Sequence, residues 1–363
     1  MREYLVCFLV AAAVTYLLTP PVRRLAIKAK AMAEVRDRDI HATPTPRWGG
    51  LAMYGGFLAG LLIASKLPGM AVVFGSNRQP LALVVGSTLI VGLGLLDDRF
   101  GLDAPTKFAG QALAAGSMAF LGIQMVWLPI GGTLVLDPLT SVLLTVLFVV
   151  LTINAVNFVD GLDGLAAGIV GIAATAFFVY AFLLSVEFGF DRATLAALIC
   201  ALLAGICVGF LPHNLNPARL FMGDTGSMLI GLLLAASAIT LSGRVDPSAV
   251  RGELLLPAIL PLLLPLAVIA VPLLDVAMAV VRRTRRGRSP FAPDKEHLHH
   301  RLIELGHSQR RAVALMYAWT ALIAFSAVAV ALVPWPVALV VFLVGLAGLA
   351  FLVSRPAAAL SRR

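Results

Sequence analysis

The stretch Val91-Gly92-Leu93-Gly94-Leu95-Leu96-Asp97-Asp98 ends an apolar run on two adjacent carboxylates. Carboxylates at membrane depth are costly unless they are paired, hydrated or bound to a cation. Elsewhere in the chain, other apolar runs also end or begin at acidic residues. The five aspartates placed in this way are Asp97, Asp98, Asp160, Asp163 and Asp224. The pattern predicts membrane helices that gather acids at one face, where carboxylate oxygens suit a hard cation.

The composition of the whole chain agrees with this interpretation. Of 363 residues, 60% are hydrophobic and 13% are charged, whereas soluble domains have roughly 25% charged residues. One membrane-spanning helix needs about 20 apolar residues. We therefore expect an all-α, polytopic membrane bundle of ten to eleven transmembrane helices, forming a single domain over residues 1–363. The expected spans are 4–19, 49–66, 81–96, 108–127, 139–157, 165–185, 193–211, 227–241, 254–281, 313–333 and 335–353.

Basic residues set the expected orientation. If the loop 21–47 is cytoplasmic, 22 of the 28 Lys and Arg residues lie on the cytoplasmic side, as the positive-inside rule requires. The N-terminus is then outside and the C-terminus cytoplasmic, in the inner (plasma) membrane. The net charge of +9 reflects this topology and attraction to anionic lipids. Binding of nucleic acid is not expected, because the sequence shows no folded basic domain that could hold it. The expected cytoplasmic loops are 21–47, 97–107, 158–164, 212–226 and 282–312.

The segment 154–165 is the second polar stretch. Asn154 and Asn157 stand three residues apart and share a helix face, and Asp160-Gly161 and Asp163-Gly164 then turn the chain. Amides and carboxylates from such a turn suit a nucleotide or a hydrated metal. A polar hairpin between two spans is the alternative. Because two asparagines buried in an apolar helix need partners, a functional role is favoured.

The third stretch, Gly223-Asp224-Thr225-Gly226-Ser227, opens the eighth apolar run. Thr225 or Ser227 is expected to cap that helix, whose free amides would attract an anion. Asp224 would then be a metal ligand beside phosphates.

The fourth stretch lies in the loop 282–312. His297, His299, His300 and Arg301 occur in a segment with leucines at helical spacing, which predicts a short amphipathic helix. Three histidines suit zinc, but no cysteine is near, and the arginine beside them favours anions. Recognition of a phosphate or a sugar is the preferred interpretation, and a structural surface helix stays open as the alternative.

Together the four stretches provide the groups that phosphoryl transfer requires. Their acids suit Mg²⁺, with Mn²⁺ as a substitute, and Lys107 and Arg301 suit phosphates. A soluble substrate would not require eleven spans, so one reactant is expected to be a lipid.

At these residues the chain resembles the polyprenyl-phosphate N-acetylhexosamine-1-phosphate transferases. Asp97-Asp98 with Lys107, the segment 154–165, Gly223–Ser227 and His297–Arg301 occur in the family's order. The resemblance implies transfer of a sugar phosphate from a UDP-N-acetylhexosamine to an undecaprenyl or decaprenyl phosphate, with release of UMP, at the start of cell-wall or surface-glycan synthesis. The leucine between His297 and His299 resembles the branch that uses UDP-N-acetylglucosamine.

The resemblance also implies roles for single residues. Asp224 resembles the Mg²⁺ ligand, and Asn157 and the rest of 154–163 resemble further ligands and nucleotide contacts. Asp97 and Asp98 resemble the pair near the lipid phosphate, and Lys107 the lysine near the phosphates. The residues that resemble the loop selecting the sugar nucleotide are His297, His299, His300 and Arg301.

Several alternatives remain open at this point. A phosphate monoester is mostly dianionic at pH 7, so direct attack by the lipid phosphate is favoured over an aspartyl-phosphate intermediate. A phospho-N-acetylmuramoyl-pentapeptide transferase is the alternative within the family. An ion-coupled transporter is the alternative of another class, although no internal repeat is evident. A homodimer is compatible with the sequence.

Overall fold

The computed structural model describes residues 1–32, 44–75, 78–128, 134–187, 194–242, 284, 307–330 and 333–354. Eight helices in this part of the chain are long and apolar enough to cross a membrane, and a ninth candidate is a pair of segments bent by 99°. The expected polytopic helical bundle is therefore confirmed. The expected span 254–281 and the residues His297, His299, His300 and Arg301 lie outside the described residues.

Ten of the eleven expected spans fall on described residues, and each coincides with a helix. The α-helices are α1 (Arg2–Lys28), α2 (Gly49–Ala64), α3 (Ala71–Phe74), α4 (Gln79–Phe100), α5 (Ala104–Phe120), α6 (Pro138–Val159), α7 (Leu165–Glu187), α8 (Thr194–Asn214), α9 (Gly223–Ser242), α12 (Gln309–Val330) and α13 (Trp335–Ser354). A short 3₁₀ helix, Pro68–Met70, precedes α3, and two strands, β1 (Trp127–Leu128) and β2 (Leu134–Val135), pair antiparallel.

Two helix ends differ from expectation. Helix α1 continues through Pro20 and Pro21 to Lys28, because packing of the buried Val22 and Ala26 outweighs the two missing amide donors. Helix α5 ends seven residues before the expected position. Gly122 there has a φ of +99°, a left-handed conformation that stops a helix. The chain then forms the β1–β2 hairpin, a small exception to the all-helical expectation.

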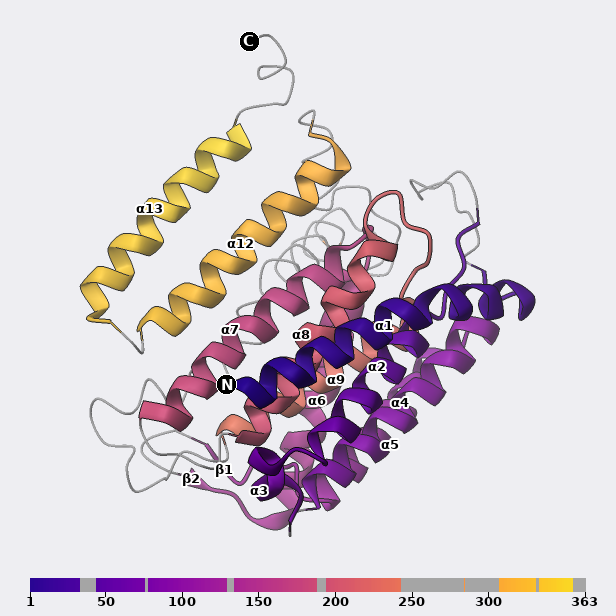
Figure 1. The fold of residues 1–363 in the computed structure, drawn as a ribbon, viewed down its shortest axis with the longest axis horizontal. Helices are drawn as coiled ribbons and strands as arrows, with labels where there is room; N and C mark the ends of the chain where they lie inside the picture. The colour runs from indigo at the N-terminus through magenta and orange to yellow at the C-terminus, as the bar shows by residue number, and fades with distance from the viewer. Residues whose placement is uncertain are drawn as a thin grey trace.

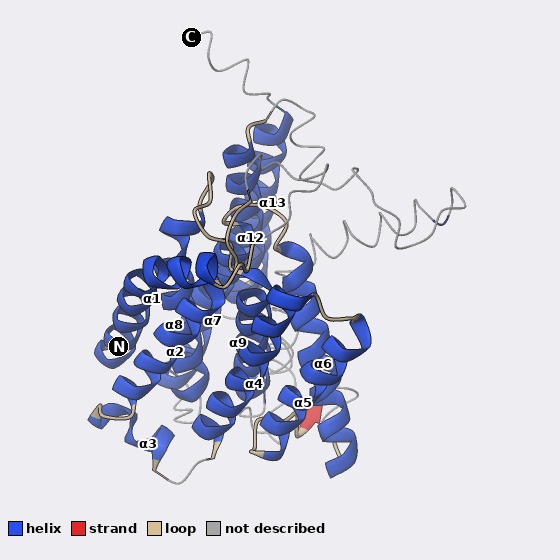
Figure 2. Cartoon of the chain, turned by 90° about the vertical axis from the view of Figure 1, so that its right-hand side faces the viewer, coloured by secondary structure: helices blue, strands red, loops and turns tan. Residues whose placement is uncertain are grey.

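Helix α9 is the centre of the bundle. Every side chain from Thr225 to Ser242 is buried, and α9 contacts α2, α4, α6 and α8. Glycines allow the backbones to approach: a Cβ on Gly231 would lie 2.8 Å from Ile153 Cα in α6. Helix α12 packs on α7, and α13 packs on α12 at the edge of the bundle (Figure 1). Figure 2 shows the bundle from a second side, with α9 between α4, α6 and α8.

The helix order brings the polar stretches to one end of the bundle. Asp97 and Asp98 lie in the last turn of α4, and Asn157 in the last turn of α6, whereas Lys107 and Asp224 lie in the first turns of α5 and α9. Because α4 and α6 end where α5 and α9 begin, these side chains meet at the N-terminal end of the buried central helix.

Candidate active site

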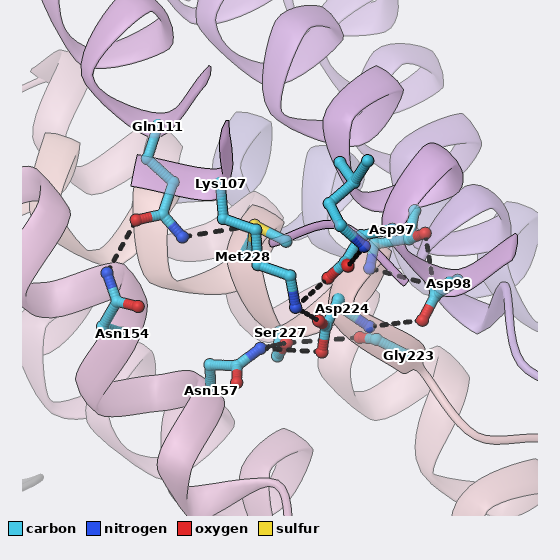
Figure 3. A network of polar contacts seen from close by, with 12 residues as sticks. Asp97, Asp98, Lys107, Gln111, Asn154, Asn157, Gly223, Asp224, Ser227 and Met228 are labelled. Carbon is cyan, nitrogen blue, oxygen red and sulfur yellow. Dashed lines mark hydrogen bonds and ion pairs between the residues drawn. The ribbon is translucent and has the colours of Figure 1, made fainter. Parts of the chain in front are cut away.

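A lysine lies between two carboxylates at the centre of the site. Lys107 Nζ forms ion pairs with Asp97 Oδ2 and, at 2.9 Å, with Asp224 Oδ2 (Figure 3). The other oxygen of Asp97, Oδ1, accepts a hydrogen bond from the Leu102 amide at 2.8 Å. The cation thus links α4, α5 and α9, and it reduces the repulsion between the two carboxylates.

Asn157 binds the opposite side of Asp224. Its Nδ2 donates to Asp224 Oδ1 and to Ser227 Oγ, both at 2.9 Å. The amide oxygen of Asn157 accepts no hydrogen bond from the described residues. It is therefore available to a metal ion or to a hydroxyl group of a substrate.

Asp98 has a different position from its neighbour Asp97. Its Oδ1 accepts the Asp224 amide at 2.9 Å, and its Oδ2 accepts the amide and the hydroxyl of Thr225 at 3.1 and 2.6 Å. The cap of α9 is therefore Asp98, and not Thr225 or Ser227 as expected. The anion expected at this helix terminus is the carboxylate of Asp98 itself.

Asp160 lies in the turn after α6. Burial raises its pKa to about 8; the carboxylates of Asp224, Asp98 and Asp163 also raise this pKa, whereas Arg47 lowers it. These electrostatic interactions indicate that Asp160 belongs to the same group of charges as Asp224 and Asp98.

Two other expected site residues bind elsewhere. Asn154 donates to Gln111 Oε1 at 2.7 Å and to the Val150 carbonyl at 2.8 Å, one helical turn from Asn157. Asp163 Oδ2 accepts hydrogen bonds from Asn216 Nδ2 and the Ala218 amide, both at 3.0 Å. In this structure Asp163 thus links the turn after α6 to the segment before α9.

Sequence reasoning missed two polar residues near this cluster. Gln111 lies one turn after Lys107 on α5, and its Nε2 donates to the sulfur of Met228 at 3.5 Å. The sequence feature that could have identified Gln111 is a single amide side chain within an apolar run, four residues after a lysine and therefore on the same helix face. Arg47 was missed because it is one of seven basic residues in the loop 21–47.

The described residues contain no group of three or more His, Cys, Asp or Glu side chains with the geometry of a metal site. Two features explain this finding. Both oxygens of Asp98 are bound to α9, and Lys107 lies between Asp97 and Asp224. The chemistry available from these residues is the binding of an anion by Lys107 and the Asn157 amide, and the binding of a cation by the carboxylates of Asp97 and Asp224.

Comparison with known proteins identifies the family. Residues 80–242, which contain this site, match glycosyl transferase family 4. The chain is 46% identical to the decaprenyl-phosphate N-acetylglucosaminephosphotransferase of Mycobacterium tuberculosis, over 90% of this chain and 82% of that protein. It is 31% identical to a probable undecaprenyl-phosphate N-acetylglucosaminyl 1-phosphate transferase of Bacillus subtilis, over 87% and 82%. It is also 32% identical to the phospho-N-acetylmuramoyl-pentapeptide-transferase of Desulforudis audaxviator, over 94% and 98%. The chain therefore belongs to glycosyl transferase family 4, the polyprenyl-phosphate N-acetylhexosamine-1-phosphate transferases, as a multi-pass membrane protein.

Proposed function

We propose that this protein transfers N-acetylglucosamine-1-phosphate from UDP-N-acetylglucosamine to a polyprenyl phosphate, releasing UMP. The observation that carries the proposal is the contact of Lys107 with both Asp97 and Asp224 at the end of apolar helices. A polar cluster at this position suits a lipid whose phosphate lies at the membrane surface. By the positive-inside rule, this surface is the cytoplasmic face of the inner membrane.

The relatives support the choice of substrates. The mycobacterial proteins at 46–48% identity are named for decaprenyl phosphate and N-acetylglucosamine, and the pentapeptide transferase of Desulforudis is 32% identical. The greater identity favours the amino-sugar donor over the pentapeptide donor. The names of these relatives also support the expected acceptor, a polyprenyl phosphate.

Mg²⁺ is the cofactor that we propose for this reaction. Mg²⁺ takes one or two carboxylates from a protein and completes its shell with water and substrate phosphates. Asp224, Asp97 and the available amide oxygen of Asn157 fit that requirement. When bound, the ion would neutralise phosphate charge, and Lys107 would be released to contact a phosphate.

Direct attack by the lipid is the step that these contacts favour. An oxygen of the polyprenyl phosphate bonds to the β-phosphorus of the donor, the bond from that phosphorus to the bridging oxygen breaks, and UMP leaves with that oxygen. An aspartyl-phosphate intermediate needs a free carboxylate oxygen. Both oxygens of Asp98 accept hydrogen bonds from α9, and a lipid phosphate that is mostly dianionic at pH 7 is itself a sufficient nucleophile.

Purified full-length protein in detergent tests the proposal. UMP is measured with decaprenyl phosphate, Mg²⁺ and either UDP-N-acetylglucosamine or UDP-N-acetylmuramoyl-pentapeptide. We expect UMP only with the amino-sugar donor, and none without the lipid. Release with the pentapeptide donor alone would assign the protein to the other branch, and stoichiometric UMP without lipid would contradict direct attack.

A further inference from the structure

The segment before α2 is fastened to the segment before α9 by backbone hydrogen bonds. The Phe221 amide donates to the Pro46 carbonyl at 2.9 Å, and the Gly49 and Gly50 amides donate to the carbonyls of Phe221 and Met222 at 3.0 and 2.9 Å. Arg47 lies inside this ladder, and its own amide donates to the Ala31 carbonyl at 2.9 Å. These bonds therefore hold the backbone around Arg47 against Phe221 and Met222, which precede Asp224 by three and two residues.

Close packing fixes the same segment. A Cβ on Gly50 would lie 2.2 Å from the Gly226 amide nitrogen, so the first turns of α2 and α9 touch backbone to backbone. Between Arg47 and Gly49, Trp48 has a φ of +80°, a left-handed conformation that is rare for a large side chain. Strained residues of this kind persist where the surrounding structure over-determines them, often at ligand sites.

The guanidinium of Arg47 forms no hydrogen bond or ion pair with the described residues. Its charge nevertheless lowers the pKa of Asp160, which the charges of Asp224 and Asp98 raise. Lys107, by contrast, is paired with Asp97 and Asp224. The two cations therefore differ. Lys107 is paired with two carboxylates, whereas the Arg47 side chain is paired with none of the described residues.

The two cations also differ in their surroundings. Large exposed apolar side chains flank Asp97 and Lys107: Leu96, Phe100 and Phe108 are 51%, 70% and 52% exposed. These residues form a surface suited to a hydrocarbon chain. Arg47 lies before α2, outside the membrane helices, in a segment whose backbone is hydrogen-bonded to Phe221 and Met222 just before Asp224. A lipid phosphate is therefore expected beside Lys107, and a water-soluble anion beside Arg47.

The geometry points to Arg47 as a binding residue for the diphosphate of the sugar-nucleotide donor. This inference rests on the proposed function and deepens it. A guanidinium presents a planar fork of donors that matches two phosphate oxygens at once. With Lys107 beside the lipid phosphate, Arg47 supplies the second positive charge that two reacting anions need.

Kinetics of Arg47→Gln and Arg47→Lys test this assignment. Arg24→Gln is the matched control, because Arg24 is an exposed arginine on α1. With Mg²⁺, we expect the KM for UDP-N-acetylglucosamine to rise about ten-fold in Arg47→Gln, the factor for loss of one charge-assisted hydrogen bond. The KM for UDP-N-acetylglucosamine should rise less in Arg47→Lys, and the KM for decaprenyl phosphate should not change in either variant. A rise confined to the lipid KM, or a fall in kcat with both KM values unchanged, would overturn the inference.

Calorimetry separates this inference from the proposed function and from misfolding. UDP and uridine are titrated into the full-length protein with Mg²⁺. We expect Arg47→Lys and Arg47→Gln to weaken UDP binding and to leave uridine binding unchanged, which also reports an intact nucleoside site. Equal weakening of both ligands would contradict a diphosphate contact. A wild-type protein that binds UDP but makes no UMP would refute the proposed function alone.

Discussion

Asp98 at the end of α4 holds Thr225 in the first turn of α9 by two hydrogen bonds to one oxygen. Asp98 Oδ2 accepts the Thr225 hydroxyl at 2.6 Å and its amide at 3.1 Å, while Oδ1 accepts the Asp224 amide at 2.9 Å. A carboxylate at a helix N-terminus is stabilised by the unpaired amides and the helix dipole. The backbone of the proposed metal ligand Asp224 is therefore positioned by an acid from another helix.

Asp98→Ala is expected to destabilise the protein by about 2 kcal/mol or more, because it leaves buried donors of α9 without an acceptor. Asp98→Asn should cost less, since it keeps one acceptor oxygen. Thermal unfolding in detergent measures both variants. The matched control is Asp103→Ala, because Asp103 also stands before a helix but makes no side-chain cap. Equal midpoints for Asp98→Ala and Asp103→Ala would show that the cap is dispensable.

Lys107→Gln is expected to lower turnover by at least about 100-fold, a typical effect of removing a group that stabilises a transferring phosphoryl group. The same change should strengthen the apparent binding of Mg²⁺, because Asp97 and Asp224 would lose the cation that now competes for them. Titration of UMP release with Mg²⁺ measures both effects.

Asp224→Asn is expected to change the apparent Mg²⁺ affinity in the opposite direction in the same titration. It removes a carboxylate charge, so the apparent Mg²⁺ affinity should fall while the protein stays folded. If Lys107→Gln lowers the apparent affinity for Mg²⁺ as much as Asp224→Asn does, the lysine does not occupy the position that we assign to the ion.

The spans and the meeting of the acids were predictable for a common reason. Apolar runs of bilayer length must alternate in direction, so Asp97 at the end of α4 and Asp224 at the start of α9 had to lie at the same end of the bundle. Helix ends were less predictable. Pro20 does not stop α1, because tertiary packing outweighs local preference, and α5 ends at a left-handed glycine.

The division of labour between neighbouring acids could not be predicted. Asp97 and Asp98 are adjacent in sequence, but one faces Lys107 and the other faces the amides of α9. That difference depends on the rotation of α4 against α9, which the close approach of Gly94 and Thr225 sets. Asp163 similarly turns toward Asn216, a partner 53 residues away, and no local pattern announces such a contact.

Asp163→Asn is expected to act on structure and not on the metal. Because Asp163 Oδ2 accepts the Asn216 side chain and the Ala218 amide, loss of the charge should lower the unfolding midpoint and turnover together. The Mg²⁺ concentration for half-maximal UMP release should stay at the wild-type value, in contrast to Asp224→Asn. A selective loss of Mg²⁺ dependence in Asp163→Asn would instead make Asp163 a ligand.

Two glycines on α4 should respond to alanine with opposite signs. A Cβ on Gly94 would lie 2.4 Å from Thr225 Cα and 2.6 Å from its amide nitrogen, whereas a Cβ on Gly92 would meet nothing within 4 Å. Backbone atoms cannot move aside as a flexible side chain can, so Gly94→Ala must push α4 from α9. Such overpacking costs about 1–3 kcal/mol.

Gly92→Ala should leave stability unchanged or raise it by up to about 1 kcal/mol, the helix preference of alanine over glycine. Gly94→Ala should also lower turnover, because the displacement separates Asp98 from Thr225 and moves Asp224 relative to Lys107. Unfolding midpoints and UMP release of the two variants, purified side by side in one detergent, make the comparison. Indistinguishable variants would mean that α4 and α9 do not pack at the distance that positions Asp224, and the contact between Lys107 and both carboxylates would then lose its structural basis.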